Sequence, residues 1–292
     1  MSIPLQHHRR AGIIGRPVRH SLSPAFQGAA FEACGLDVQY ELWDTAPEAL
    51  AGRLVSLRAP EFLGANVTIP YKEAVIPLLD ELGGQSARAG AVNTIVNRDG
   101  RLFGFNTDGP GFVSALKDEA GFDPAGRSIL LLGAGGAARG IAFALAEARV
   151  GSLTIANRSL QRAERLAGDV TTAMAGPVDA IATPTSLLPY DCVVNGTSVG
   201  MHGGSAPGQS PVNLETARPG TLVADIVYAP LETPMLHAAK ARGLPVLGGL
   251  AMLVYQGALA FELWTGLAAP VEVMFSAART ALAANVARAA PP

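Results

Sequence analysis

A glycine-rich turn near the middle of the chain constrains its fold more than any other feature. The apolar run at 128–132 is followed by Gly-Ala-Gly-Gly-Ala-Ala at 133–138 and then by a helical pattern. A glycine-rich turn alone is often only a tight connection, but this order of strand, G-x-G-x-x-A and helix is typical of a dinucleotide-binding βαβ unit. Gly133 would allow the turn, Gly135 would let the backbone approach a pyrophosphate, and Ala138 would keep helix and strand close. We therefore expect phosphates at the helix N-terminus, where N–H groups and the dipole favour anions.

The end of the next predicted strand indicates which dinucleotide is bound. The strand at 153–156 ends in Asn157-Arg158-Ser159, and Arg162 follows one helical turn later. An NAD site usually has Asp or Glu here for the ribose 2′-hydroxyl, whereas guanidinium groups suit a 2′-phosphate. The two arginines could also be solvated surface charges, but cations at a helix start oppose the helix dipole. The sequence therefore favours NADP over NAD.

Strand-like and helix-like runs alternate along the chain in two series, which predicts an α/β protein with mainly parallel sheets flanked by helices. We expect one α/β domain over 1–107, completed by C-terminal helices at 251–292, and a dinucleotide-binding domain over 108–250. The expected strands are 11–15, 38–43, 63–68, 92–96, 102–105, 128–132, 152–156, 191–195, 221–226 and 244–247. The expected helices are 24–33, 46–57, 71–82, 112–119 and an apolar series from 251 onward.

The low charge of the chain raises the question of a membrane segment. Charged residues make up 16% and hydrophobic residues 49%, and the stretch from Gly243 to Phe261 carries no charge. Pro245, Gly248 and Gly249 would interrupt a helix there, so we expect a short strand, a turn and a buried helix. A net charge of −2 also argues against nucleic acid or anionic lipid as a main partner.

Cysteine and histidine usage indicates a cytoplasmic protein without a metal site. The first ten residues contain no apolar core of a signal peptide. Cys34 and Cys192 form no close-spaced pair, which favours free thiols in a reducing compartment. The five histidines show no spacing typical of zinc ligands.

Four polar clusters lie at predicted strand or helix ends of the first series, where sites form in α/β proteins. They are His-Ser-Leu-Ser-Pro at 20–24, Asn-Val-Thr-Ile-Pro-Tyr-Lys at 66–72, Ala-Val-Asn-Thr at 91–94 and Asn-Thr-Asp-Gly at 106–109. Taken singly, each has an ordinary explanation as a helix cap or a polar turn. It is the order of these clusters along the chain that points to one particular family.

The chain resembles the shikimate dehydrogenase family over nearly its whole length. The matching stretches are SLSP at 21–24, GANVTIPYK at 64–72, GAVNT at 90–94, NTDG at 106–109, GAGGAARG at 133–140, NRS at 157–159, DIVYAPLETPML at 225–236 and MLVYQ at 252–256. The resemblance implies an N-terminal α/β substrate domain and an NADP-binding Rossmann domain with a cleft between them. It also implies NADPH-dependent, reversible reduction of 3-dehydroshikimate to shikimate in aromatic amino-acid biosynthesis, and it leaves a homodimer open.

The same resemblance implies the roles of individual residues. Ser21 and Ser23 would bind the substrate carboxylate, and Tyr228 would close the cleft. The residues around the ring hydroxyls and the reacting carbon would be Thr68, Lys72, Asn93, Asp108 and Gln256, with Lys72 and Asp108 as the catalytic pair. The implied cofactor contacts are Gly133, Ala134, Gly135, Gly136, Ala137, Asn157, Arg158, Ser159, Arg162, Thr197 and Gly249.

The chemistry of the reaction is compatible with Lys72 and Asp108 in these roles. Hydride transfer to a carbonyl carbon builds negative charge on its oxygen, and a proton must arrive there. Lys72 can donate that proton. We expect it in the first turn of a helix after Pro70, where the dipole disfavours a cation, whereas a neighbouring Asp108 carboxylate would favour one. The sequence does not decide between these opposed effects, and the pair could also be purely structural.

Two other functions stay open at this stage. One is a quinate/shikimate dehydrogenase paralogue that uses NAD or NADP. The other is a non-catalytic nucleotide-binding regulator, which predicts a broken Lys–Asp pair or an added DNA-binding segment. Lys72 and Asp108 are both present, and the net charge of −2 does not suit DNA.

Overall fold

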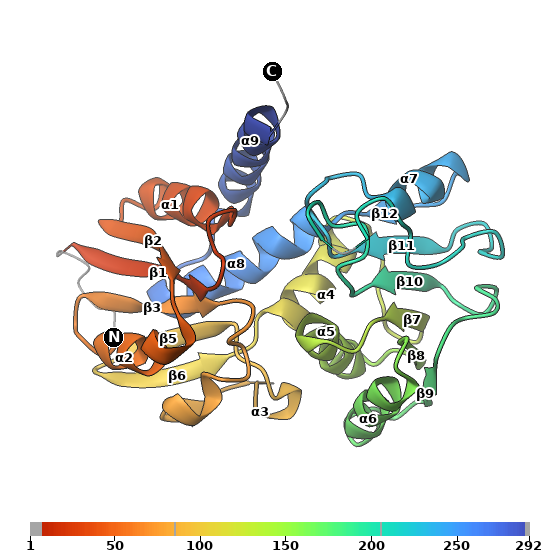
Figure 1. Cartoon of the computed structure of the whole chain (residues 1–292), viewed down its shortest axis with the longest axis horizontal. Helices are drawn as coiled ribbons and strands as arrows, with labels where there is room; N and C mark the ends of the chain where they lie inside the picture. Colours follow the sequence, from red (N-terminus) through yellow and green to blue (C-terminus); the bar gives the residue numbers. More distant parts are fainter. Residues whose placement is uncertain (1–7, 85, 205, 290–292) are drawn as a thin grey trace. The chain divides into compact units, whose positions relative to one another are not determined.

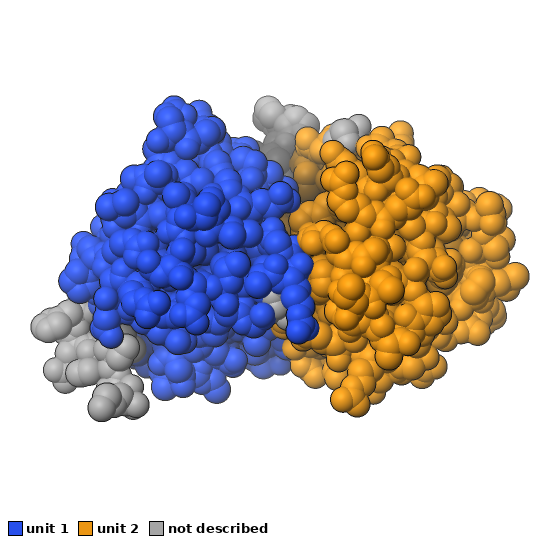
Figure 2. Space-filling model, turned by 90° about the horizontal axis from the view of Figure 1, so that it is seen from below, with its two compact units in different colours: residues 1–107, 254–292 blue, residues 108–253 orange. Residues whose placement is uncertain are grey.

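The computed structural model describes residues 8–84, 86–204 and 206–289 (Figure 1). Contacts divide the chain into two compact units, residues 1–107 with 254–292 (unit 1) and residues 108–253 (unit 2), which Figure 2 shows in different colours. Within the described residues each unit has a six-stranded sheet. The protein is therefore of the α/β class, as the alternation of strands and helices predicts.

The sheet of unit 1 is mixed, with strand order β2-β1-β3-β5-β6-β4. Its strands are β1 (Arg9–Gly15), β2 (Val38–Asp44), β3 (Phe62–Val67), β4 (Glu81–Leu82), β5 (Thr94–Arg98) and β6 (Arg101–Phe105). The β1–β2, β1–β3 and β4–β6 pairs are parallel, and β3–β5 and β5–β6 are antiparallel. Asp99 and Gly100 have φ values of 52° and 81°. This left-handed pair closes the β5–β6 hairpin, because two-residue hairpins require positive φ at both central positions.

The helices of unit 1 agree with expectation except over 71–82 and over 86–89, where a short helix was not predicted. They are α1 (Ser23–Ala33), η1 (Pro47–Ala49), α2 (Leu50–Ser56), η2 (Ile76–Leu78), α3 (Ser86–Ala89) and α9 (Val271–Ala289), and α8 (Gly249–Thr265) enters this unit from unit 2. The helix predicted over 71–82 is wrong: the chain forms turns, the single 3-10 turn η2 and the short strand β4. Pro77 explains this, because proline has no N–H to donate within a helix.

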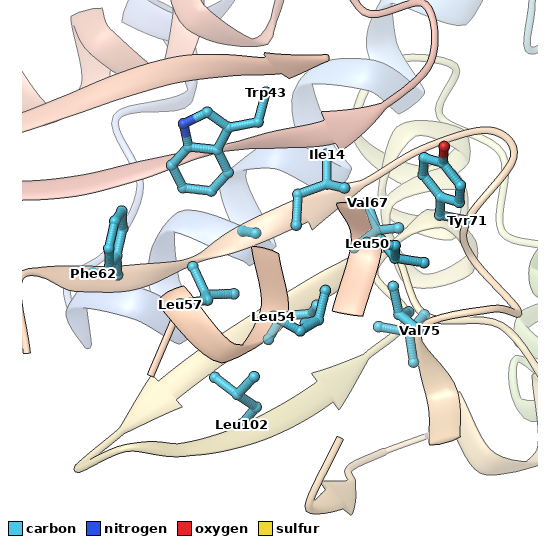
Figure 3. Packing of buried hydrophobic residues seen from close by; sticks show 13 residues of the cluster. Ile14, Trp43, Leu50, Leu54, Leu57, Phe62, Val67, Tyr71, Val75 and Leu102 are labelled. Atoms are coloured by element: carbon cyan, nitrogen blue, oxygen red, sulfur yellow. The ribbon is translucent and has the colours of Figure 1, made fainter. Parts of the chain in front are cut away.

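The core of unit 1 forms where α2 covers the sheet (Figure 3). Leu50 and Leu54 of α2 pack with Ile14 of β1 and Val67 of β3, and all four are at most 6% exposed. Trp43 contacts Phe62 edge to face, with ring centroids 5.7 Å apart. This core holds the carboxyl ends of β1 and β3 rigidly, where the polar clusters of the sequence begin.

Unit 2 has a fully parallel sheet with strand order β12-β11-β10-β7-β8-β9. Its strands are β7 (Ser128–Leu132), β8 (Ser152–Ala156), β9 (Val178–Ile181), β10 (Cys192–Asn195), β11 (Leu222–Asp225) and β12 (Val246–Leu247), and its helices are α4 (Asp108–Asp118), α5 (Gly136–Glu147), α6 (Leu160–Thr171) and α7 (Pro234–Ala241). Every residue of β10 and β11 is buried, as expected for a parallel sheet covered on both faces. Strand β9 was not predicted, because Val-Asp-Ala-Ile has no strong strand pattern.

The uncharged stretch raised the question of a membrane segment, and the structure shows what this stretch forms. The stretch from Gly243 to Phe261 forms the short strand β12 and most of α8, with Gly248 between them, so a strand precedes a buried helix as predicted. Within the described ranges, no helix combines the length and apolar character needed to cross a bilayer. Cys34 and Cys192 are both free, also as predicted.

Candidate active site

The glycine-rich turn of unit 2 has the geometry that a pyrophosphate site needs. Gly133 has φ +110°, and its N–H donates to the Ala156 carbonyl at 2.7 Å. A Cβ there would lie 3.0 Å from the carbonyl oxygen of Gly196, so glycine is required. Gly135 is the N-cap of α5 and has no side chain to accept the first N–H groups of the helix. A Cβ on Gly135 or Gly136 would meet no described atom within 4 Å, so open space lies before the helix N-terminus.

The predicted phosphate-binding arginines lie beside this turn. Leu132 pairs with Ala156 across β7 and β8, so the residues after both strands are neighbours. The Asn157 amide donates to the Ser159 carbonyl at 2.9 Å. Ser159 is the N-cap residue of α6, yet no capping bond from its hydroxyl is found among the described residues. Arg158 and Arg162 are exposed.

The arginine pair and the turn together fit an anionic dinucleotide. None of the ion pairs found within 8–84, 86–204 and 206–289 involves Arg158 or Arg162. Both guanidinium groups are therefore available to a phosphate, next to the Ser159 hydroxyl. Ala134 and Ala137 are half-buried in the turn and in the first turn of α5. The residues present thus fit both the pyrophosphate and the 2′-phosphate of NADP.

A buried carboxylate organises the loops that follow β10 and β11. Asn195 and Asp225 are paired in register, and the Asn195 amide donates to Asp225 Oδ1 at 2.9 Å. Thr197, a predicted cofactor contact, donates from its hydroxyl to Asn195 Oδ1 at 2.6 Å. Asp225 also accepts from the Val227 N–H at 2.9 Å and from the Thr233 hydroxyl at 2.7 Å. Burial raises the pKa of the Asp225 carboxyl, and these hydrogen bonds oppose that shift.

Tyr228 and Gly249 lie close to this carboxylate. Gly249 is the first residue of α8, and it packs against the backbone just after β11. A Cβ on Gly249 would lie 2.3 Å from the Ile226 carbonyl oxygen. Only glycine allows that approach. Tyr228 is half-buried two residues further on, and burial raises the pKa of its hydroxyl. It therefore stays protonated and can donate a hydrogen bond at neutral pH.

In unit 1, Asn93 is the centre of a buried polar network. Its Oδ1 accepts from the Thr107 N–H at 2.7 Å, and its amide nitrogen donates to the Thr107 hydroxyl at 2.9 Å and to Gln256 Oε1 at 3.3 Å. Since a backbone N–H can only donate, the bond to Thr107 fixes which way the Asn93 amide faces. The structure thus joins Asn93 and Gln256, two predicted substrate contacts 163 residues apart.

The network extends from Asn93 through Asn66 to Tyr40. The Asn66 amide donates to the Asn93 carbonyl at 3.2 Å and to the Thr94 hydroxyl at 3.1 Å. Tyr40 donates to Asn66 Oδ1 at 2.7 Å. The two predicted carboxylate-binding serines contact each other, because the Ser23 N–H donates to Ser21 Oγ at 3.2 Å.

Four members of this network were not among the predicted site residues. Asn66, Thr94 and Thr107 stand inside the polar clusters, so the sequence carried a signal for them. Tyr40 lies in the middle of β2, and its alternating strand pattern gives no such signal.

Thr68 and Lys72 follow β3 in the same unit. The Thr68 N–H donates to the Ile14 carbonyl at 2.9 Å, and the Lys72 carbonyl accepts from the Val92 N–H at 2.8 Å. Lys72 is therefore held beside Asn93, and its side chain is half-buried. The helix-dipole effect expected at Lys72 does not apply, because residues 72–75 form turns instead of the predicted helix.

Asp108 is the first residue of α4, four residues earlier than the predicted helix start. It is buried at the N-terminus of this helix. It directly follows Thr107, whose N–H is fixed by Asn93. Among the described residues, no three His, Cys, Asp or Glu side chains group so as to hold a metal ion.

A parallel sheet with this turn, together with a second α/β unit that carries a buried amide and hydroxyl network, defines a dinucleotide-binding protein of the α/β class. The matching family models are the shikimate dehydrogenase substrate binding domain over residues 13–95, shikimate / quinate 5-dehydrogenase over 116–201, and the shikimate 5'-dehydrogenase C-terminal domain over 249–279. A shikimate dehydrogenase (NADP(+)) of Moorella thermoacetica is 50% identical over 94% of this chain and 93% of that protein. The chain belongs to the shikimate dehydrogenase family.

Solved structures agree with this assignment. Shikimate 5-dehydrogenase from Thermus thermophilus, in complex with NADP(H) and shikimate, has a TM-score of 0.84 and 45% identity, over 94% of this chain and 99% of that chain. Quinate dehydrogenase from Corynebacterium glutamicum, in complex with NAD, has a TM-score of 0.85 and 32% identity, over 93% of this chain and 99% of that chain. The predicted family and fold class are thus confirmed.

Proposed function

We propose that this chain catalyses the reversible NADPH-dependent reduction of 3-dehydroshikimate to shikimate. The observation that carries the proposal is the 50% identity to an NADP(+) shikimate dehydrogenase along nearly the full length of both proteins. We further propose that unit 1 is the substrate-binding domain and unit 2 the dinucleotide-binding domain, close to the division at 107 and 250 expected from the sequence.

The proposed cofactor is NADP, which supplies a hydride when bound in its reduced form. The N–H groups at the start of α5 and the turn at 133–137 would hold its pyrophosphate. Arg158, Ser159 and Arg162 would bind the 2′-phosphate, because guanidinium groups and a hydroxyl can donate hydrogen bonds to it. Thr197, held by Asn195, and Gly249 would complete the site.

The proposed substrate site lies on the polar network of unit 1. Ser21 and Ser23 would bind the carboxylate, and Thr68, Asn93 and Gln256 would bind the ring hydroxyls. The Asn93 side chain is oriented before substrate arrives, because its amide is hydrogen-bonded to Thr107 and to Gln256. Tyr228 would contribute a neutral hydroxyl from unit 2.

Lys72 and Asp108 are the proposed acid–base pair. The Lys72 ammonium gives a proton from Nζ to the carbonyl oxygen as that oxygen gains negative charge, and it takes the proton back in the reverse direction. The Asp108 carboxylate orients the ammonium and stabilises its charge. Both residues are tied to the surroundings of Asn93, Lys72 through Val92 and Asp108 through Thr107.

Quinate is the alternative substrate, favoured by the similarity to quinate dehydrogenase. The test is an absorbance assay for reduced nicotinamide with the purified protein, pairing shikimate or quinate with NADP or NAD. We expect shikimate with NADP to give the highest kcat/KM. A higher kcat/KM with quinate, or with NAD, would contradict the proposed substrate or cofactor respectively.

Two further expectations concern location and assembly. A cytoplasmic location agrees with the two free thiols. Cell fractionation tests the location, and light scattering on the purified chain tests the homodimer.

A further inference from the structure

We propose that Gln27 is a positioning residue that sets the spacing between the two ends of the substrate site. The inference rests on the proposed function, in which Ser21 and Ser23 meet the substrate carboxylate and Gln256 meets a ring hydroxyl. Gln27 is fully buried, so it acts on the substrate only through the residues that it holds in place.

The buried face of α1 carries both Ser23 and Gln27. Ser23 is the first residue of this helix, and Gln27 follows four residues later on the same face, one turn away. Ser23 is 3% exposed and Gln27 is 0% exposed. The Ser23 N–H donates to Ser21 Oγ at 3.2 Å. Because one turn of helix is rigid, a bond that fixes Gln27 also fixes the end of α1 where the two serines lie.

A single hydrogen bond from Gln27 joins this face to α8. The Gln27 amide nitrogen donates to the Gly257 carbonyl at 2.9 Å, across 230 residues of sequence. Phe31 and Phe261, each four residues further along its helix, contact each other with ring centroids 5.2 Å apart. Two successive turns of α1 therefore pack on two successive turns of α8.

The approach of the two helices is close because residue 257 is glycine. A Cβ there would lie 2.4 Å from the Phe26 ring and 3.2 Å from the Gln27 amide nitrogen. Gly257 directly follows Gln256, whose Oε1 accepts from the Asn93 amide at 3.3 Å. Gln256 is therefore fixed from two sides, at its side chain by Asn93 and at its neighbouring backbone by Gln27.

The oxygen of the Gln27 amide indicates that stability is not what this residue contributes. In the part of the chain that the structure describes, Gln27 Oε1 is buried without a hydrogen-bond partner. Such an acceptor costs free energy of folding, and an apolar side chain of the same shape avoids that cost. The Gly257 carbonyl does not depend on Gln27 either, because it lies inside α8 and accepts a helix hydrogen bond. What the amide adds is the placement of α8 against α1.

The test compares Gln27→Met with the wild type at saturating NADP. Methionine has a similar length but cannot donate, so we expect KM for shikimate to rise roughly fivefold, the scale of one net hydrogen bond. KM for NADP should stay unchanged. The midpoint of urea unfolding should stay the same or rise, because the unpartnered oxygen is removed. Gln39→Met, the same change at an exposed position of β2, is the control and should alter none of these values.

A double-mutant cycle distinguishes positioning of Gln256 from a general structural effect. We expect Gln256→Ala to raise KM for shikimate roughly tenfold in the wild-type background, but less than about threefold in the Gln27→Met background, where Gln256 is already displaced. Thr68→Ala removes a proposed substrate contact that lies outside both helices. It should raise KM by the same factor in both backgrounds.

Gly257→Ala tests the same spacing from the side of α8. The added Cβ must push α8 away from Phe26, so KM for shikimate should again rise, and the effect of Gln256→Ala should again shrink. If Gln27→Met does not fold, these two measurements on Gly257→Ala decide instead.

The outcomes separate the inference from the function it rests on. An unchanged KM for shikimate in Gln27→Met, or equal effects of Gln256→Ala in both backgrounds, would show that the inference is wrong while the function stands. If the wild-type protein does not oxidise shikimate at all, the proposed function fails and the inference falls with it.

Discussion

The buried amides and hydroxyls of unit 1 are the residues on which substrate recognition depends. A buried donor or acceptor without a partner costs about 1–3 kcal/mol, so Asn66, Asn93 and Thr94 are held in one arrangement by the bonds they share. The resemblance pointed to Asn93 but not to Asn66 or Tyr40. A sequence motif can show that a polar side chain is present. Only the folded structure shows which carbonyl or N–H group fixes the orientation of that side chain.

At the residue scale, the role of Lys72 is open to direct test. Lys72→Ala removes the proposed proton donor, so we expect kcat to fall roughly 10²-fold or more, the usual scale for a positioned acid–base group. KM for NADPH should change little, because Lys72 belongs to unit 1. Lys117→Ala, which removes an exposed lysine of α4 3.9 Å from Asp123, is the matched control. A fully active Lys72→Ala enzyme would rule out the assignment.

The two arginines after β8 predict cofactor preference. Arg158→Ala and Arg162→Ala should each raise KM for NADP roughly tenfold or more, since a charge-assisted hydrogen bond contributes about 1.5–3 kcal/mol. KM for NAD, which has no 2′-phosphate, should stay the same. The exposed Arg165 lies one turn further along α6, and Arg165→Ala should leave both values unchanged. Equal losses for NADP and NAD would show that these arginines do not bind the 2′-phosphate.

At the scale of elements, local patterns predicted the strands better than they predicted the segment after β3. The βαβ unit from β7 to β8 was predicted because a glycine turn, an apolar strand and a helix agree with one another. The segment after Pro70 has apolar residues at helical spacing, but Pro77 prevents a helix and the tertiary structure makes turns there. Its backbone bond to Val92, which no local pattern shows, is what places Lys72.

The buried carboxylate between β10, β11 and α7 predicts how stability depends on pH. Burial raises the pKa of Asp225 above 3.8, its value in an unfolded chain. At a pH between the unfolded and the folded pKa of Asp225, the folded protein binds more protons at this residue than the unfolded chain does. The free energy of unfolding therefore falls as pH rises through this range. We expect the wild type to lose stability relative to Asp225→Asn as pH rises from about 4 through the raised pKa of Asp225 in the folded protein.

Urea unfolding of both proteins across that pH range measures the effect. The same substitution at the exposed Asp179 of β9 is the control, and its stability curve should run parallel to that of the wild type. A wild type that gains stability relative to Asp225→Asn with rising pH would contradict the burial of an ionisable group at this position.

At the scale of the whole molecule, the low charge of the chain follows from its architecture. Two α/β units with covered sheets, one of them fully parallel, bury long apolar strands and need few charged residues, which are 16% of the chain. The residues that the function requires are therefore a small polar set at strand ends. Their placement in space depends on long-range pairing such as Asn93 with Gln256, which the sequence indicates only through the family resemblance.

The central claim is that this chain reduces 3-dehydroshikimate with NADPH. The most direct measurement incubates the purified protein with both compounds, follows loss of the reduced nicotinamide absorbance, and quantifies the product by chromatography against authentic shikimate. We predict one shikimate formed for each NADPH oxidised, and no NADPH loss without 3-dehydroshikimate. NADPH that is not consumed, or a product other than shikimate, would contradict the account.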